Sequence, residues 1–315
     1  MMFPEYYNRK NKMPFAQKGS QLISGEFEVE IKDNIPYFAG SGSYAALFGD
    51  QWKEYKKTQL DSYTRHPISA NRLNRCLGEL ANNLNGKLVL EAGCGAGRFT
   101  EILLQQGAQL VSSDLSSAVE VNKENFPLTE KHIVIQSDIN DMPYADETFD
   151  VVICIGVIQH TPNSEETIGN LFKLVKKGGT LIIDHYTFNK SSALRTAILF
   201  RLYLKNLPYS KTIPFTQSLV KRFLPFHKKF KGNKLASVLL NRISPVISYY
   251  DGIPELNDKQ QEEWALLDTH DSLTDFYKRF RNKKEILKCL NDLGATNIWC
   301  EYGGNGVEAR CRKAL

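Results

Sequence analysis

The chain has 315 residues, 42% hydrophobic and 24% charged, so it is long and apolar enough to bury an α/β domain. No apolar run approaches the roughly 20 residues of a membrane-spanning helix, and the N-terminus lacks the apolar stretch of a signal peptide. The net charge is +5, and the six cysteines form no CxxC pair, which disfavours a zinc ribbon or a disulfide framework and indicates a cytoplasmic protein.

Residues 1–86 are predicted to form an N-terminal segment whose helices cover the functional site. The segment around residues 27–31 indicates a short strand pair before the turn signal of Asn34 and Pro36. Residues 43–63 and 70–84 indicate helices, because apolar residues recur at helical spacing in the second of them.

From Lys87 short apolar strands alternate with helices. We expect strands at 87–93, 108–114, 132–138, 149–156 and 180–186, and helices at 97–107 and 165–179. This alternation predicts a parallel sheet covered on both faces. A helix at 282–295 and two closing strands within 295–313 complete it. The prediction is an α/β protein with a Rossmann-like, seven-stranded, mostly parallel sheet, whose core comprises residues 87–186 and 281–315.

Residues 187–280 interrupt the alternation and are predicted to form a large helical insert after the fifth strand. Ligands of parallel sheets bind at the carboxyl ends of the strands, so the insert is expected to act as a lid or substrate-binding unit. Residues 186–250 contain twelve Lys or Arg and no Asp or Glu, and the rest of the chain therefore sums to −7. Interleaved basic and aromatic residues suit an anionic membrane surface, a phosphate-bearing ligand or RNA. A solvated lid with incidental charge is the alternative.

A glycine-rich loop joins the first core strand to the helix that follows it. Gly93, Gly95 and Gly97 alternate in EAGCGAG, which lets the backbone approach a ligand, and the N–H groups of the following helix suit a carboxylate. A dinucleotide fingerprint would need a third glycine where Arg98 stands, and no Gly-Lys-Ser/Thr of a P-loop is present. Glu91 would repel a pyrophosphate, but it suits a ligand that carries an ammonium and a sulfonium.

Acidic residues follow the next two strands. Asp114 stands 21 residues after Gly93, where it is placed to accept both hydroxyls of a ribose. Asp138 is placed to accept from an adenine amino group, with Ile139 packing on the ring. Each residue alone is equally well explained as a turn or helix-cap residue, so only their combination predicts a nucleoside-containing ligand.

These segments resemble the successive motifs of class I S-adenosylmethionine-dependent methyltransferases. The motifs are EAGCGAGRFT, VSSDLS, QSDINDMPYADETFDVV, GVIQHTPN and VKKGGTLII, and they cover roughly residues 87–186. The resemblance implies S-adenosylmethionine (SAM) as cofactor and S-adenosylhomocysteine (SAH) as product. It implies cofactor-binding roles for Glu91, Gly93, Cys94, Gly95, Gly97, Asp114, Leu115, Asp138, Ile139 and Gly156.

A looser resemblance extends beyond the core. FGDQWKEYKKTQLDS, WALLDTHDSLTDFY and GGNGVEAR are similar to segments of methyltransferases from bacterial glycan and cell-surface polysaccharide clusters. Such relatives often begin with a cysteine-containing segment that resembles a zinc ribbon. Here DNIPYF is present without those cysteines, so we expect no metal site.

Three residues are candidates for the chemistry. Transfer of a methyl group to an oxygen depends on orientation of the acceptor and gains from a general base. His160, after the fourth strand, and His185, at the end of the fifth, are candidate bases, with structural roles in a loop and in the core as the alternatives. Asp271 is expected to position the base or acceptor, and a helix cap is the alternative.

Neighbouring polar residues are secondary candidates. Asp268 and His270 share the LDTHD motif with Asp271. Gln59 and Asp61 are candidates for closing over the ligand, with a helix-surface role as the alternative.

The sequence thus predicts a SAM-dependent O-methyltransferase of a sugar, a glycan or a related small acceptor. The expected partner is an anionic small molecule or a lipid- or nucleotide-linked sugar, with peripheral contact to an anionic membrane through residues 190–242 at the inner face, and no DNA. The alternatives are an N-methyltransferase of RNA or of a small amine, and a non-catalytic SAM-binding regulatory homologue.

Overall fold

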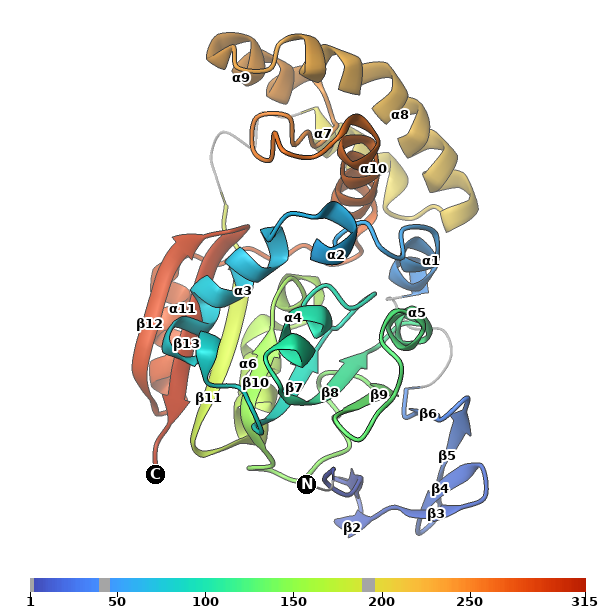
Figure 1. Cartoon of the computed structure of the whole chain (residues 1–315), viewed down its shortest axis with the longest axis vertical. Coiled ribbons are helices and arrows are strands. Elements are labelled where there is room, and N and C mark those ends of the chain that lie inside the picture. Colours follow the sequence, from blue (N-terminus) through green and yellow to red (C-terminus); the bar gives the residue numbers. More distant parts are fainter. Residues whose placement is uncertain (1–2, 40–45, 189–195) are drawn as a thin grey trace.

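An eleven-stranded mixed sheet forms the centre of the molecule (Figure 1). The computed structural model describes residues 3–39, 46–188 and 196–315. The sheet has the order β12-β13-β11-β10-β7-β8-β9-β6-β5-β4-β3. Its core strands are β7 (Leu88–Ala92), β8 (Gln109–Asp114), β9 (His132–Gln136), β10 (Phe149–Cys154), β11 (Val175–Tyr186), β12 (Ala295–Gly303) and β13 (Gly306–Lys313).

The five central strands run parallel, so the chain crosses over between each of them and the next. Every side chain of β7 is buried, as expected for a strand covered on both faces. In its register Val89 pairs with Leu110 on one side and with Val151 on the other. Strand β13 lies antiparallel between β11 and β12. The carboxyl ends of β7, β8 and β10 therefore meet at one edge of the sheet.

The expected count of seven strands is wrong, because the N-terminal segment extends the sheet. Strands β3 (Ala16–Lys18), β4 (Gln21–Ser24), β5 (Phe27–Lys32) and β6 (Ile35–Tyr37) are joined by antiparallel pairing. Tyr37 of β6 then pairs in parallel with Gln136 at the edge of β9. A separate two-stranded sheet contains β1 (Tyr7–Asn8) and β2 (Met13–Pro14).

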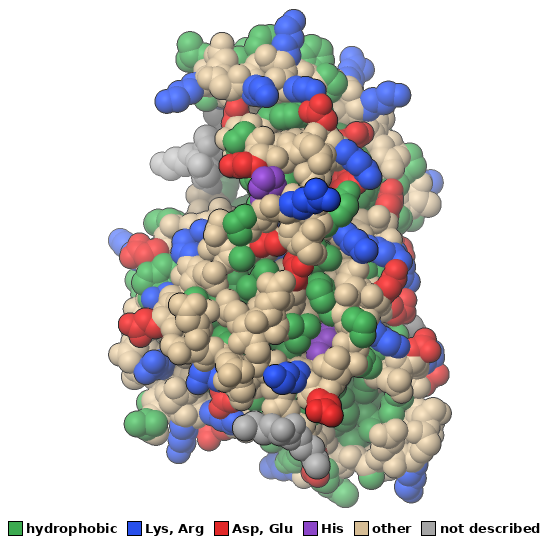
Figure 2. Space-filling model, in the orientation of Figure 1, with side chains coloured by type: hydrophobic (Ala, Val, Ile, Leu, Met, Phe, Trp, Pro, Cys, Tyr) green, Lys and Arg blue, Asp and Glu red, His purple; other side chains and the backbone are tan. Residues whose placement is uncertain are grey.

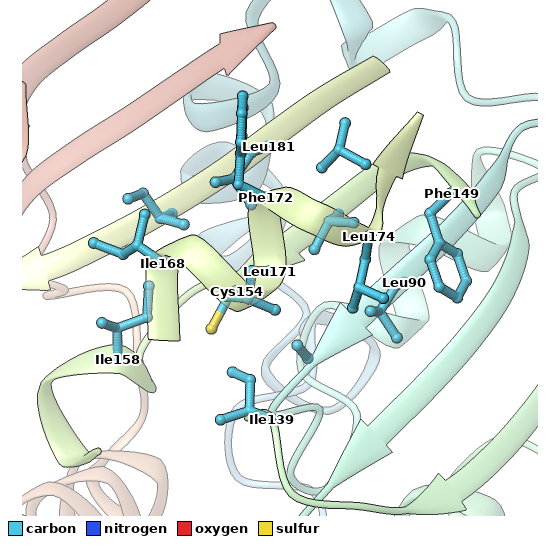
Figure 3. Close-up of a cluster of buried hydrophobic side chains, with 14 of the residues drawn as sticks. Leu90, Ile139, Phe149, Cys154, Ile158, Ile168, Leu171, Phe172, Leu174 and Leu181 are labelled. Carbon is cyan, nitrogen blue, oxygen red and sulfur yellow. The ribbon is translucent and has the colours of Figure 1, made fainter. Parts of the chain in front are cut away.

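Helices cover both faces of the core strands. Helices α6 (Ser164–Leu174) and α11 (Lys283–Asp292) pack on one face through a large apolar cluster, part of which is drawn in Figure 3. The other face is covered by α3 (Ile68–Leu77) and α4 (Thr100–Gln105). The remaining elements of this part are α1 (Ala46–Glu54), α2 (Asp61–Thr64), the 3-10 helices η1 (Gly78–Asn82) and η2 (Ile158–His160), and α5 (Ala118–Asn125).

Two expected helices differ from the structure. The helix expected at 43–63 is divided into α1 and α2, and its residues 43–45 lie outside the described residues. The helix expected at 165–179 ends at Leu174, because Val175 already pairs with Phe149 and begins β11.

Four helices form a cap over the carboxyl edge of the sheet (Figure 1). They are α7 (Ala197–Leu204), α8 (Tyr209–Lys229), α9 (Lys234–Ile243) and α10 (Asp258–Thr274). The cap has a small apolar core of its own, in which Leu204, Leu224 and Leu273 meet. None of the described helices is long and apolar enough to cross a membrane.

Candidate active site

A cavity of about 900 Å³ lies between the carboxyl edge of the sheet and the cap. This volume is in the range of small-molecule and cofactor sites, roughly 300–1,000 Å³. Its walls come from three parts of the chain that are distant in sequence: the glycine loop and the ends of β8 and β10, helices α1 to α3, and helix α10 with the segments beside it.

The glycine loop forms the floor of the cavity. The N–H groups of Gly93 and Cys94 both donate to the carbonyl of Ser113, at 2.7 and 2.9 Å, and so fix the loop to the end of β8. Gly93 has a φ of +82°, and a Cβ at this position would lie 2.2 Å from the side chain of Val157. Glycine is therefore required here by both backbone conformation and space.

Asp114 holds the loop from the end of β8. One carboxylate oxygen accepts from the N–H of Gly95 at 3.0 Å, and the other accepts from the N–H and hydroxyl of Ser116 at 2.8 and 2.7 Å. Burial raises the pKa of Asp114 although these hydrogen bonds oppose the shift. Asp114 and Leu115 both line the cavity, so the carboxylate stands where a ribose bound over the loop would meet it.

Glu91 lies beneath the loop and is almost fully buried. Its Oε2 accepts from the hydroxyl of Thr100 at 2.5 Å and from that of Ser112 at 3.4 Å, whereas Oε1 is buried without a hydrogen bond among the described residues. Burial raises the pKa of Glu91 to about 8. A ligand ammonium placed at the loop would favour the ionised carboxylate, which is the chemistry expected of this residue.

Small and apolar residues line the rest of the floor. Gly156 has a φ of +83°, and a Cβ there would meet no atom within 4 Å, so the missing side chain leaves room for a ligand. Ile139 and Ser137 also line the cavity, whereas Asp138 between them is not part of the lining. The Asp138 carboxylate accepts from the N–H of Asn140 at 2.8 Å and closes a turn.

His160 and Asp271 line the cavity beneath the cap. The Nδ1 atom of His160 lies 3.2 Å from the carbonyl of Tyr277 and 3.4 Å from Oδ2 of Asp275. A neutral imidazole that donates from Nδ1 carries its lone pair on Nε2. Burial lowers the pKa of His160, but the carboxylates of Asp271 and Asp275 outweigh this effect and raise it. Burial also raises the pKa of Asp271.

The two other candidate histidines lie outside the lining of the cavity. His185 is buried, its Nε2 lies 2.9 Å from the hydroxyl of Ser164, and its Nδ1 lies 2.9 Å from the carbonyl of Tyr186. His270 is held between Gln51 and Thr212 at 2.8 and 2.9 Å. Burial lowers the pKa of both imidazoles. His185 thus joins β11 to α6, and His270 joins α10 to α1 and α8.

Gln59 and Asp268 meet in the cavity wall. The amide of Gln59 donates to Asp268 at 3.3 Å, and the hydroxyl of Tyr249 also donates to this carboxylate. Asp61 instead accepts the N–H groups of Ser69 and Ala70 and so holds the start of α3.

Arg98 lines the cavity directly after the glycine loop, although no functional role was predicted for it. Its guanidinium donates to the hydroxyl of Ser69 at 3.0 Å and to the side-chain oxygen of Gln59 at 3.3 Å. It forms no ion pair with any carboxylate of the described residues, and burial lowers its pKa to about 10. Its position as a basic residue directly after the glycine loop was the only feature of the sequence that could have indicated a role in the site.

The structure brings most of the predicted site residues to one cavity. Its lining contains Gly93, Cys94, Gly95, Asp114, Leu115, Ile139, Gly156, His160 and Asp271. Four further candidates are not part of this lining, namely Glu91, Gly97, Asp138 and His185.

The chain is similar to known methyltransferases. The family described as methyltransferase domain matches residues 90–183. A ubiquinone biosynthesis O-methyltransferase of Coxiella burnetii is 32% identical over 170 residues, which cover 53% of this chain and 72% of that protein. An enzyme of the same name from Vibrio cholerae is 35% identical over 146 residues, 45% of this chain, and the chain spans only 59% of that relative.

A solved structure of a magnesium protoporphyrin IX methyltransferase from Synechocystis with bound SAH is 15% identical. It has a TM-score of 0.44, with 83% of this chain and 91% of that chain covered. The family match spans the glycine loop and Asp114 and reaches Ile183 in β11. The chain belongs to the class I S-adenosylmethionine-dependent methyltransferases.

Proposed function

We propose that this protein transfers a methyl group from SAM to a hydroxyl oxygen of a small acceptor. The observation that carries the proposal is the shared cavity, in which a glycine loop and Asp114 lie at the floor and His160 and Asp271 lie beneath the cap. A cofactor-binding half and a proton-accepting half thus face one space.

The floor residues would hold SAM. Asp114 would accept the ribose hydroxyls, and the guanidinium of Arg98, which lines the cavity directly after the glycine loop, would hold the methionine carboxylate. Ile139 and the open space at Gly156 fit an apolar ring, and the buried Oε1 atom of Glu91 suits a nearby ammonium. When bound, SAM supplies an electrophilic methyl group, and SAH leaves with the electron pair of the broken carbon–sulfur bond.

His160 would accept the proton of the acceptor hydroxyl. Its Nδ1 atom faces the Tyr277 carbonyl, so Nε2 is the basic nitrogen. Asp271 would stabilise the imidazolium that forms, as the carboxylates beside His160 already raise its pKa. The cap would keep water out of the cavity, because α10 contributes Trp264 and Leu267 to its wall.

Two features support an oxygen acceptor: the imidazole beside two carboxylates, and relatives named as O-methyltransferases. We keep a sugar or a lipid- or nucleotide-linked sugar as the predicted acceptor class. A small amine is the second candidate, because the carboxylates of Asp268 and Asp271 in the cavity wall would attract a cation.

Turnover with defined acceptors tests the proposal. The protein is incubated with methyl-labelled SAM and separate sets of phenols, sugar derivatives and amines, and SAH release and label in the product are measured. We expect labelled ether products, and loss of turnover in His160→Ala with SAH affinity retained. A labelled amine would select the second candidate. SAH binding without turnover on any set would instead indicate a non-catalytic homologue.

A further inference from the structure

Two cap helices turn an apolar face to solvent. On α9 the exposed residues Leu235, Val238, Leu239 and Ile243 recur at helical spacing, and Leu235 is 85% exposed. No side chain of α9 is fully buried. On α7, which supplies Leu204 to the cap core, the outer face carries Ile198, Leu199, Leu202 and Tyr203, with Leu199 69% exposed.

The two apolar faces are neighbours. The N–H and hydroxyl of Thr196, at the start of α7, donate to the carbonyls of Arg242 and Ile243 at the end of α9, at 3.0 and 2.9 Å. Apolar side chains on two helices joined in this way make a larger patch than the scattered residues of an ordinary surface.

Unpaired positive charge is concentrated in the same segment of the chain. Of the ten described Lys and Arg residues between 186 and 250, only Arg201 and Lys228 form ion pairs. The others are Lys205, Lys211, Lys221, Arg222, Lys229, Lys231, Lys234 and Arg242. Lysine and arginine side chains occur beside hydrophobic ones at the upper end of the molecule in Figure 2, where Figure 1 places α8 and α9.

We propose that the outer faces of α7 and α9 dock the protein on an anionic lipid bilayer. Aliphatic side chains on a helix that lies flat on the surface enter the headgroup region, and the basic residues around them contact anionic headgroups. This surface goes beyond the proposed methyl transfer, and its test requires no turnover.

The charge and the residue types favour a bilayer over other occupants. A second copy docked on the same face would bring two sets of unpaired cations together. Single-stranded RNA binds through aromatic stacking platforms, whereas the two outer faces present seven aliphatic side chains and a single aromatic one, Tyr203. The membrane contact predicted from the sequence covered residues 190–242. The proposal narrows it to the outer faces of α7 and α9. Residues 190–195 lie outside the described part of the chain.

Sedimentation with vesicles of stated composition tests the docking. We expect the full-length protein to bind vesicles of phosphatidylcholine and phosphatidylglycerol but not vesicles of phosphatidylcholine alone, and to be released by salt. Leu235→Asp with Leu239→Asp should weaken binding at least about tenfold, because a charge replaces each apolar side chain that would enter the headgroup region. Lys231→Gln with Lys234→Gln should weaken it about tenfold and reduce its dependence on salt.

A matched control changes the same residue types on another surface. Met13→Asp with Lys18→Gln alters an exposed apolar and a basic residue of the N-terminal hairpins and should bind as the unaltered protein does. Circular dichroism checks that each variant is folded.

Four results would overturn the docking surface. The first is failure to bind anionic vesicles at low salt. The second is undiminished binding by the variant that carries Leu235→Asp and Leu239→Asp. A dimer in light scattering that this variant dissociates would identify a second copy as the occupant. Tighter retention by polyuridylate than by vesicles at the same salt would identify RNA.

Discussion

The guanidinium carbon of Arg98 lies 5.4 Å from the centre of the Trp264 ring. Arg98 belongs to the segment after the glycine loop and Trp264 to helix α10 of the cap. The same guanidinium donates a hydrogen bond to the hydroxyl of Ser69 in α3. Arg98 therefore links the core, the N-terminal helices and the cap at the cavity wall.

Arg98→Gln is expected to lower SAH affinity about ten- to a hundredfold, because a charge-assisted contact to the methionine carboxylate is lost. The affinity for 5′-methylthioadenosine, which has no carboxylate, should remain nearly unchanged. Calorimetry with both ligands measures this difference. Arg222→Gln on the surface of α8 is the control. Equal losses for both ligands would mean that Arg98 acts through the structure of the loop.

Asp114→Asn is expected to weaken SAH binding about tenfold or more, because the ribose loses an ionised acceptor. Asp138→Asn provides the comparison, since this carboxylate closes a turn beside Asn140 and is not part of the cavity lining. We expect a change of at most about threefold there. A larger loss at Asp138 than at Asp114 would restore the adenine-binding role that the sequence suggested.

Glu91 makes stability depend on pH in the ligand-free protein. Its pKa rises from 4.5 to about 8 on folding, so the folded chain binds the proton more tightly and stability falls as pH rises through this interval. Between pH 5 and 8 the loss amounts to about 3 kcal/mol. Urea unfolding across this range should show the slope in the natural protein and a smaller one in Glu91→Gln. Identical slopes in the two proteins would disprove this contribution of Glu91.

The rate of methyl transfer should rise with pH as His160 loses its proton. The carboxylates of Asp271 and Asp275 raise the pKa of His160, so the rising limb is expected above its ordinary value of 6.5. Asp271→Asn removes one carboxylate and should move the limb to lower pH. A kcat profile against pH measures both. If the limb stays in place in Asp271→Asn, another group controls the rate.

Local signals allowed the sequence to predict the floor of the site. The glycine loop and Asp114 each follow a short apolar strand, and the carboxyl ends of parallel strands share one edge. His160 was placed at this edge in the same way, as a polar residue in the loop after β10, and its role as a base stays a prediction. These inferences needed only the chain order.

The sequence-based predictions differ from the structure where the position of a residue depends on the direction of its side chain or on partners that are distant in sequence. Asp184 and His185 are consecutive on β11 and point to opposite faces. Asp184 accepts the N–H of Gly156 at 2.6 Å and the guanidinium of Arg72, so His185 is directed toward Ser164 instead.

Pairing between segments that are distant in sequence could not be predicted from local patterns either. The addition of β6 to β9 depends on backbone hydrogen bonds, which no local pattern of side chains specifies. The position of Arg98 likewise depends on partners from α3 and α10 that lie far away in sequence.

The N-terminal strands also protect the protein from aggregation. Without β6, the N–H and carbonyl groups along β9 would form an open edge able to recruit strands of other chains. The pairing of Tyr37 with Gln136 covers the carboxyl end of this edge and moves the end of the sheet outward to β3. That strand has only three residues, all exposed, and ends in Lys18. A short, charged edge is a poor template for intermolecular β-pairing, so the hairpins keep the parallel core from joining neighbouring molecules.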